Sequence, residues 1–173
     1  LFAFTESFGT DYSFTMSHFV EGVLQGGVMK NSWIAAMSTA AITTLFGIAL
    51  AFLTIRKRFP GRTLMDFLAM LPVSLPGTFI GLALIMAFNN DPFSLTGTLW
   101  IIIIGMTLRQ LPVGYRQAVS GLKQIDKSLE QASTNLGATS FGTFRHIVLP
   151  MLKNALSVSF VYSFMKAMNT LST

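Results

Sequence analysis

The chain has 173 residues, of which 51% are hydrophobic and only 11% are charged, and its formal net charge is +5. Soluble domains usually carry about 25% charged residues, so this scarcity of charge indicates a surface that largely faces lipid, where charge is costly. The absence of cysteine excludes disulfides and thiolate metal sites.

Residues 1–31 are expected to form an N-terminal segment outside the cytoplasm, ahead of a membrane domain over residues 32–173. The segment holds one basic residue, Lys30, and three acidic residues outnumber it: Glu6, Asp11 and Glu21. It begins with Leu1 and shows neither a basic leader region nor a cleavage site. We therefore expect the chain to be a piece of a longer protein.

Four apolar stretches are candidates for membrane-spanning helices, because about 20 apolar residues cross the roughly 30 Å hydrocarbon core of a bilayer. We predict these spans over about residues 32–55, 67–90, 93–111 and 151–173. The second contains Pro72, Pro76 and Gly77, so we expect a kinked or broken helix there. The fourth is still apolar where the sequence ends, so we expect the domain to be truncated at its C-terminus.

The basic residues alternate between successive loops. Four of the twelve Lys and Arg residues lie in residues 56–62 and six lie in residues 109–153, whereas residues 89–92 hold none. By the positive-inside rule, the two basic segments face the cytoplasm. These charges flank apolar spans and are not interleaved with aromatic residues on a polar surface, so nucleic acid is not expected as a partner.

No catalytic residue and no metal ligand is predicted. The two histidines, His18 and His146, are expected on opposite sides of the membrane, and no group of His, Asp and Glu has ligand spacing. We interpret His146 as a surface or interface residue. The phosphate-binding pattern G-x-x-x-x-G-K followed by Ser or Thr does not occur in the sequence, so ATP would have to be hydrolysed by a partner.

A long segment over residues 112–150 is expected to lie in the cytoplasm between the third and fourth spans. Four apolar residues in it have the spacing of one face of an amphipathic helix: Val119, Leu122, Ile125 and Leu129. Gly137 is expected to end that helix. A second short helix is expected from Ser140, ending near the stop signal at Pro150. Two short helices around a glycine corner would form a compact knob that fits a groove in a partner.

This segment resembles the EAA loop of binding-protein-dependent ABC importer permeases, in which E-A-A is followed by three residues, G, nine residues, I, one residue and L-P. The matching positions here are Gln131, Ala132, Ser133, Gly137, Ile147, Leu149 and Pro150. Gln131 replaces the glutamate and Ser133 the second alanine of the pattern. Glu130 is adjacent and could supply the carboxylate from a different helical angle.

The resemblance extends beyond this loop to most of the chain. Four further stretches resemble the second half of fused ferric-iron-type permeases: residues 56–62 (RKRFPGR), 71–72 (LP), 76–78 (PGT) and 111–116 (LPVGYR). The resemblance implies an all-α, polytopic transmembrane helix bundle of the type I ABC importer permease kind, with cytoplasmic coupling helices. It also implies a bacterial inner-membrane location, which would make residues 1–31 periplasmic.

The resemblance implies partners as well. In this family the loop sits in a cleft of a separate ABC ATPase subunit, so residues 127–140 would be the mechanical contact. ATP and magnesium would be bound by that subunit, and this chain would hold no cofactor. A periplasmic substrate-binding protein, a second permease half or homologous subunit, and membrane lipid are the other partners that the resemblance implies.

Three polar residues in the fourth span are candidates for a translocation path. Lys166 shares one helical face with Tyr162 at i−4 and Asn169 at i+3. A charge at membrane depth costs about 2.5–3.5 kcal/mol on insertion scales, which points to a functional role. Snorkelling, or pairing with a subunit outside this sequence, is the alternative.

The sequence allows more than one substrate and more than one class of transporter. Ferric iron is the cargo that the resemblance suggests, and phosphonate, thiamine, sulfate and polyamine permeases have similar loops. A passive channel or secondary carrier would share the composition and topology but has no need of the EAA-like spacing. An intramembrane enzyme would need paired carboxylates or a Ser/His set within the spans, and the sequence shows neither.

Overall fold

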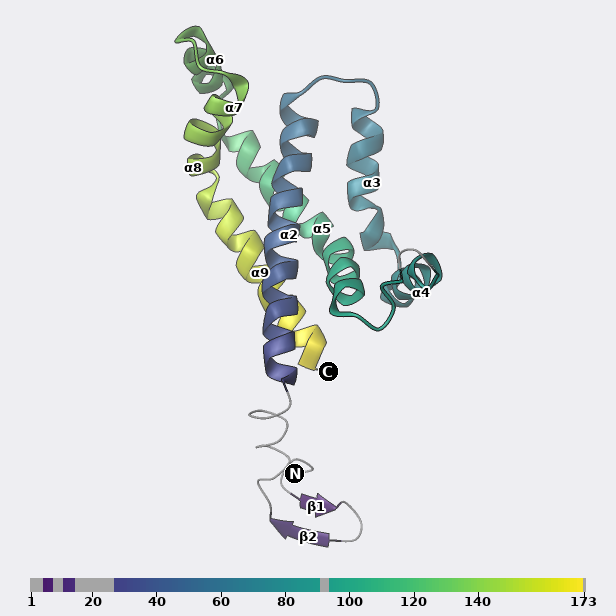
Figure 1. Ribbon diagram of the computed structural model, residues 1–173. Coiled ribbons are helices and arrows are strands. Elements are labelled where there is room, and N and C mark those ends of the chain that lie inside the picture. The colour runs from purple at the N-terminus through teal and green to yellow at the C-terminus, as the bar shows by residue number, and fades with distance from the viewer. Residues whose placement is uncertain (1–4, 8–10, 15–26, 91–93, 173) are drawn as a thin grey trace.

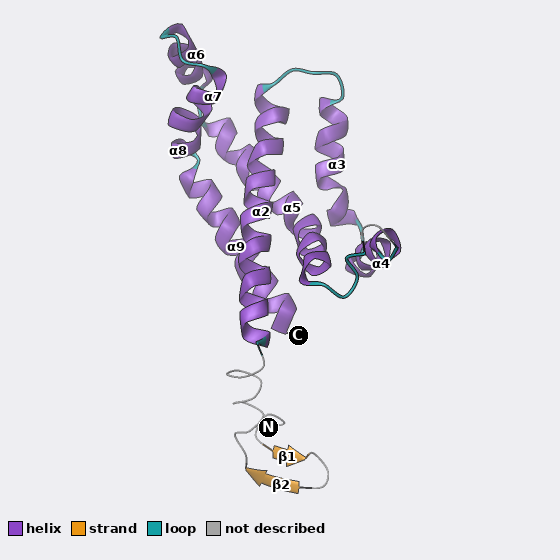
Figure 2. Ribbon diagram, in the orientation of Figure 1, coloured by secondary structure: helices purple, strands orange, loops and turns teal. Residues whose placement is uncertain are grey.

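The computed structural model describes residues 5–7, 11–14, 27–90 and 94–172 of the chain, and the predicted all-α bundle is confirmed (Figures 1 and 2). The larger helices are α2 (Val28–Arg56), α3 (Arg62–Ser74), α4 (Gly77–Phe88), α5 (Leu99–Gln124), α6 (Lys127–Asn135) and α9 (Lys153–Ser172). Between α6 and α9 lie the short helices α7 (Ser140–Thr143) and α8 (Leu149–Met151), joined by the π-helical turn η3 (Phe144–Val148).

One small β-hairpin near the N-terminus was not predicted. Strand β1 (Thr5–Ser7) pairs antiparallel with β2 (Asp11–Phe14), with Thr5 opposite Phe14. Most of the segment predicted over residues 1–31, including His18, lies outside the described residues. The same holds for residues 91–93 in the loop between the second and third predicted spans.

Helix α2 is the centre of the bundle and packs against both α5 and α9 (Figure 1). Its buried positions carry small side chains at helical spacing: Ala36, Ala40, Thr43, Gly47, Ala51 and Thr54. Small residues let helix backbones approach closely, which is how helices associate where lipid removes the hydrophobic driving force. At Gly47 the approach is so close that an added Cβ would lie 2.7 Å from the carbonyl carbon of Gly114 in α5.

Large apolar side chains lie on the outside of the bundle instead. They include Leu45, Phe46, Phe67, Phe79, Met86 and Met165, each more than half exposed. By length and composition, α2 can cross a membrane by itself, with a mean hydropathy of 1.9 over its most apolar window. The bent pairs α3–α4 and α7–α9 can do so if each is counted as one span. Helix α5, which includes most of the third predicted span, is not among these candidates, and its crossing stays a prediction.

The break that we expected in the second span is confirmed. Helix α3 ends at Ser74 and α4 begins at Gly77, and the two helices meet at an angle of 109°. Leu75 is extended because the residue before a proline is disfavoured in the helical region, and Pro76 has no N–H to donate. Pro72 lies within α3 and does not end it. The break turns α4 away from α3, toward the start of α5 (Figure 1).

One of two expectations about helices within residues 112–150 is wrong. The amphipathic stretch does not form one helix up to Gly137, because α5 ends at Gln124 and α6 begins at Lys127. The second helical stretch begins at Ser140 and ends near Pro150, as expected: Pro150 lies in its last turn, the stretch ends at Met151, and the 69° bend follows at Leu152. A proline ring clashes with the carbonyl four residues before it in an α-helix, and the π-helical turn η3 widens the helix just ahead of Pro150.

The arrangement of the loops bears on orientation. In Figure 1 the α2–α3 loop and the α6–α8 segment lie at one end of the bundle, and the α4–α5 connection lies at the other end. The basic cluster at residues 56–62 and the EAA-like segment therefore share one end, as the topology prediction requires. That this end faces the cytoplasm stays a prediction.

Candidate functional site

The first candidate site is the α6–α8 segment, residues 127–151, and its junction with the bundle. Arg56, the last residue of α2, forms an ion pair with Glu130 of α6, with 2.6 Å between Nε and Oε1. The side chains are only 6% and 19% exposed, respectively. The guanidinium also donates through Nη2 to the carbonyl oxygens of Leu122 (3.0 Å) and Ile125 (2.9 Å). One side chain thus joins the ends of α2 and α5 to α6.

This junction also explains why α5 ends where it does. The last carbonyls of a helix have no partner within the helix, and a cation near them is favourable. Arg56 supplies both a donor and a positive charge at that point. Asp126 then caps the N-terminus of α6 by accepting from the Ser128 N–H at 2.9 Å. This hydrogen bond, with smaller help from the Ser128 side chain and the Arg56 charge, holds the pKa of Asp126 below its usual value.

A second contact fixes the segment to α2. The rings of Phe52 in α2 and Phe144 in η3 pack edge to face with centroids 4.8 Å apart, a favoured aromatic geometry. Just beyond them, Val148 and Leu152 are fully or almost fully buried in the apolar core formed with α2 and α5. The segment is therefore packed onto the bundle at its base.

The corner between α6 and α7 is built on Gly137, as predicted. Its φ is +87°, in the left-handed region that favours glycine. The Gly137 N–H donates to the Thr134 carbonyl at 3.0 Å, and the Ala138 N–H donates to the Ser133 carbonyl at 3.1 Å. These two bonds form the Schellman motif that commonly ends a helix. The Ser133 hydroxyl also lies 3.0 Å from the Thr143 hydroxyl, which links α6 to α7.

The tip of the segment is apolar. Leu136 is 88% exposed and Phe141 is 71% exposed, on either side of the Gly137 corner. Large side chains exposed together mark an interaction surface. Sequence reasoning missed both residues, although two large apolar side chains beside a glycine in an otherwise polar stretch were a usable signal. We call Leu136 and Phe141 the apolar tip.

The other EAA-like residues differ in exposure. Glu130 points inward to Arg56, whereas Gln131 and Ala132 are exposed on α6. Ser133 and Ile147 are half-buried, and Leu149 and Pro150 are exposed. His146 is exposed as well, with Nδ1 at 3.0 Å from the Gly142 carbonyl oxygen. The exposed position in this part of the motif is thus held by Gln131, whereas Glu130 is turned toward the bundle.

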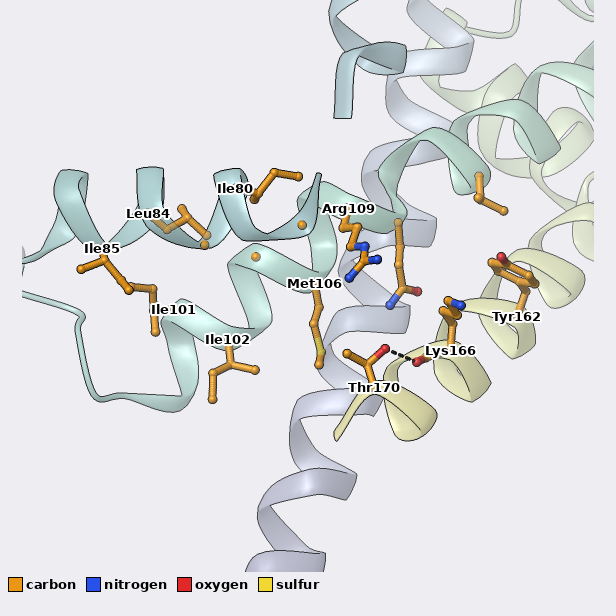
Figure 3. Close-up of a pocket in the computed structure, with 15 residues that line it drawn as sticks. Ile80, Leu84, Ile85, Ile101, Ile102, Met106, Arg109, Tyr162, Lys166 and Thr170 are labelled. Atoms are coloured by element: carbon orange, nitrogen blue, oxygen red, sulfur yellow. Dashed lines mark hydrogen bonds between the residues drawn. The ribbon is translucent and has the colours of Figure 1, made fainter. Parts of the chain in front are cut away.

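The second candidate site is a pocket of about 350 Å³ between α4, α5 and α9 (Figure 3). Tyr162 and Lys166, two of the three predicted path residues, line it, and Asn169 is not among its lining residues. Thr170 also lines the pocket and donates from Oγ1 to the Lys166 carbonyl at 2.9 Å. The pocket is otherwise mostly apolar, with isoleucines from α4 and α5 on its walls.

Two polar pocket residues from α5 were missed by the sequence analysis. Both lie at the end of the third predicted span, 93–111, and neither was named as a site residue; α5 continues through Arg109 and Gln110 to Gln124. The Arg109 side chain lies against Gly77 at the start of α4, where an added Cβ would be 2.9 Å from Nη1. Gln110 is 6% exposed. Among the described residues, no group of three His, Asp or Glu side chains could hold a metal ion.

The sequence was compared with known proteins. Residues 43–173 match the family described as "Binding-protein-dependent transport system inner membrane component". The chain is 42% identical to the ferric transport system permease protein FbpB of Actinobacillus pleuropneumoniae and to the putative ferric transport system permease protein FbpB 1 of Haemophilus influenzae. Each alignment covers 98% of this chain but only 26% and 28% of those relatives, so the chain spans about a quarter of their length.

A more distant relative has a different cargo in its name. The chain is 32% identical to the sulfate transport system permease protein CysT of Salmonella typhimurium, over 80% of this chain and 54% of that protein.

Proposed function

The chain belongs to the family of binding-protein-dependent transport system inner membrane components, and we propose that it forms part of the membrane passage of an ATP-driven importer. In this proposal the cargo arrives from a periplasmic binding protein, and the energy comes from a separate ATPase subunit that docks on the apolar tip. The chain crosses a bacterial inner membrane several times, with the α6–α8 segment in the cytoplasm and a second permease half beside it.

The observation that carries this proposal is the way in which the α6–α8 segment combines an exposed tip with a fixed base. The tip offers Leu136 and Phe141 to a partner, whereas Arg56 and Phe52 hold the base on α2. A displacement of the tip is passed to α2 and α5, because well-packed elements move as near-rigid bodies and do not deform continuously. A passive channel has no need of such a lever.

Ferric iron is the proposed cargo, because the two relatives at 42% identity are named as ferric transport permeases. Sulfate is the alternative, supported by the relative at 32% identity. The described residues offer no metal-ligating cluster, so in either case this chain provides a passage and leaves capture of the cargo to the binding protein.

The docking proposal predicts a defect on removal of the apolar tip. Phe141→Ser in the full-length permease is expected to weaken copurification with the ATPase subunit by about 30-fold, the loss of roughly 2 kcal/mol that defines an interface hot spot. Met151→Ser is the matched control, because Met151 is also exposed but lies at the base of the segment. Equal retention of the ATPase subunit by the two variants would contradict docking at the tip.

Substitution of Gly137 is expected to disturb the same contact through the backbone. An added Cβ at Gly137 would meet no atom of this chain within 4 Å, so the strain that it brings to the chain comes from the φ of +87°. A side chain in the left-handed region costs about 1–2 kcal/mol, so Gly137→Val is expected to weaken ATPase binding by roughly 5- to 30-fold. Gly137→Asn should retain most of the binding, since asparagine tolerates this conformation. Similar binding constants for both variants, measured in detergent, would refute the role of the corner.

A further inference from the structure

The pocket between α4, α5 and α9 carries charge of only one sign. Arg109 and Lys166 line it, and it has no acidic lining residue. The sequences of α4, α5 and α9 contain no Asp or Glu at any position. The described walls of this pocket are therefore electropositive, and no carboxylate on these three helices can offset the charge.

Neither cation is neutralised within the described residues. The ion pair found there joins Arg56 to Glu130, and Asp66, on α3, accepts a hydrogen bond from Tyr115. Arg109 also lies beside Gly77, the first residue of α4. A helix N-terminus carries a partial positive charge that favours anions, so an arginine there adds to an unfavourable positive potential. The positive potential of this arrangement favours a negatively charged ligand.

A buried amide on the pocket wall indicates a polar ligand. Gln110 is 6% exposed and lines the pocket, yet its Oε1 has no hydrogen-bond partner among the described residues. Most buried side-chain polar atoms do have a partner. An amide oxygen accepts hydrogen bonds, so Gln110 favours a ligand that presents an O–H donor beside its anionic oxygens, as citrate and hydrogen phosphate do.

We propose that the cargo passes this pocket as an anion, so that ferric iron crosses in a complex with excess negative oxygen ligands and not as the bare ion. The inference rests on the proposed function. Arg and Lys have donors and no acceptor, so they cannot coordinate a metal ion that prefers oxygen ligands. They do bind the carboxylate or phosphate oxygens of a complex, and arginine does so in a bidentate manner. Free oxyanions present the same chemistry.

The test uses the full-length permease with its ATPase subunit and binding protein in proteoliposomes. Three probes are supplied: radiolabelled iron with radiolabelled citrate, radiolabelled iron with radiolabelled phosphate, and radiolabelled sulfate. ATP-dependent entry of iron is expected to bring in more than one citrate or phosphate per iron, because one trivalent anion only cancels the 3+ charge of ferric iron. Arg109→Gln and Lys166→Gln are each expected to lower this uptake by about tenfold, the effect of losing one charge-assisted hydrogen bond.

The variants separate a role in the passage from a structural one. Arg109→Lys and Lys166→Arg keep the charge and should restore much of the uptake, and Lys153→Gln, on α9 but outside the pocket lining, should leave uptake unchanged. If iron enters with no more than one of these anions per iron, or if Arg109→Gln and Lys166→Gln transport normally, the anion inference is overturned while the iron assignment stands. If sulfate enters and iron does not, the iron assignment fails and the anion inference holds. If none of the anions enters, the anion inference is also overturned.

Discussion

Replacement of Arg56 by methionine is expected to destabilise the protein by about 3–5 kcal/mol, the usual cost of breaking a buried ion pair by removing one partner. The side chain of Arg56 is 6% exposed, and the Glu130 carboxylate opposite it is 19% exposed. Methionine fills part of the volume but leaves this carboxylate without its cation. It also removes the Arg56 donor from the carbonyls of Leu122 and Ile125, of which, among the described residues, Leu122 keeps only the Ile125 N–H.

Substitution of Glu130, the other partner of the ion pair, should reduce stability less. Glu130→Gln removes one charge, but Arg56 keeps its two hydrogen bonds to the end of α5, so a loss of about 1–3 kcal/mol is expected. Lys57→Met is the matched control, because Lys57 follows Arg56 directly and is exposed. The free energy of unfolding, measured by denaturant titration in detergent, should fall in the order Lys57→Met, Glu130→Gln, Arg56→Met. Equal stability of all three variants would mean that the junction contributes nothing.

The same variants test transmission of force. If Arg56 carries the motion of α6 to α2 and α5, Glu130→Gln should still bind the ATPase subunit, because the apolar tip is untouched. Its ATP hydrolysis should continue while ATP-dependent uptake falls. Retention of full uptake at the wild-type ratio of ATP hydrolysed to cargo moved would exclude the Arg56–Glu130 pair from the lever and leave it a role in stability alone.

Features that depend on neighbours in the sequence were predictable. The break at Pro76 follows from the missing N–H of proline and from the restricted conformation of Leu75. The corner at Gly137 follows from the freedom of glycine to adopt a positive φ. In both cases the local chain decides the conformation, whatever packs against it.

Features that depend on distant residues were not predictable from periodicity. The division between α5 and α6 combines a local signal, the Asp126 cap of α6, with Arg56, which lies 66 and 69 positions before the two carbonyls that it binds. Without that contact, Leu122, Ile125 and Leu129 form one apolar face, and the sequence favours one helix. Leu129 is in fact 43% exposed, because the division rotates it away from the core.

The pocket illustrates the same limit. Lys166 and Tyr162 could be identified because they share one face of one helix. Arg109 and Gln110 could not be joined to them, since they come from another helix and reach the pocket only through the packing of α5 and α9 on α2. The sign of the pocket charge is a property of three helices together, and no single segment reveals it.

The second large loss of stability is expected on substitution of Gly47, where α2 and α5 cross. A Cβ at this position would lie 2.7 Å from the Gly114 carbonyl carbon and 2.9 Å from the Tyr115 nitrogen. Both are backbone atoms, which cannot rotate away as a flexible side chain can. Gly47→Ala is therefore expected to cost about 1–3 kcal/mol by overpacking, and Gly47→Val more, although alanine is the better helix former by about 1 kcal/mol.

Substitution of Gly47 should also weaken the polar contacts that join three helices. Tyr115 follows Gly114 in α5 and places its hydroxyl by Asp66 of α3 and, at 3.0 Å, by Thr54 of α2. Separation of the helices would pull this hydroxyl from its partners, and a buried polar group without a partner costs a further 1–3 kcal/mol, roughly.

Gly81→Ala in α4 is the matched control for Gly47→Ala, because an added Cβ at Gly81 would meet no atom within 4 Å. Its free energy of unfolding should stay unchanged or rise by up to about 1 kcal/mol, the helix-propensity gain of alanine over glycine. The difference between the two alanine variants therefore isolates the close approach of the backbones from the general effect of removing a glycine. If Gly47→Ala proves as stable as Gly81→Ala, α2 and α5 do not pack backbone to backbone, and the rigid unit that the lever requires is absent.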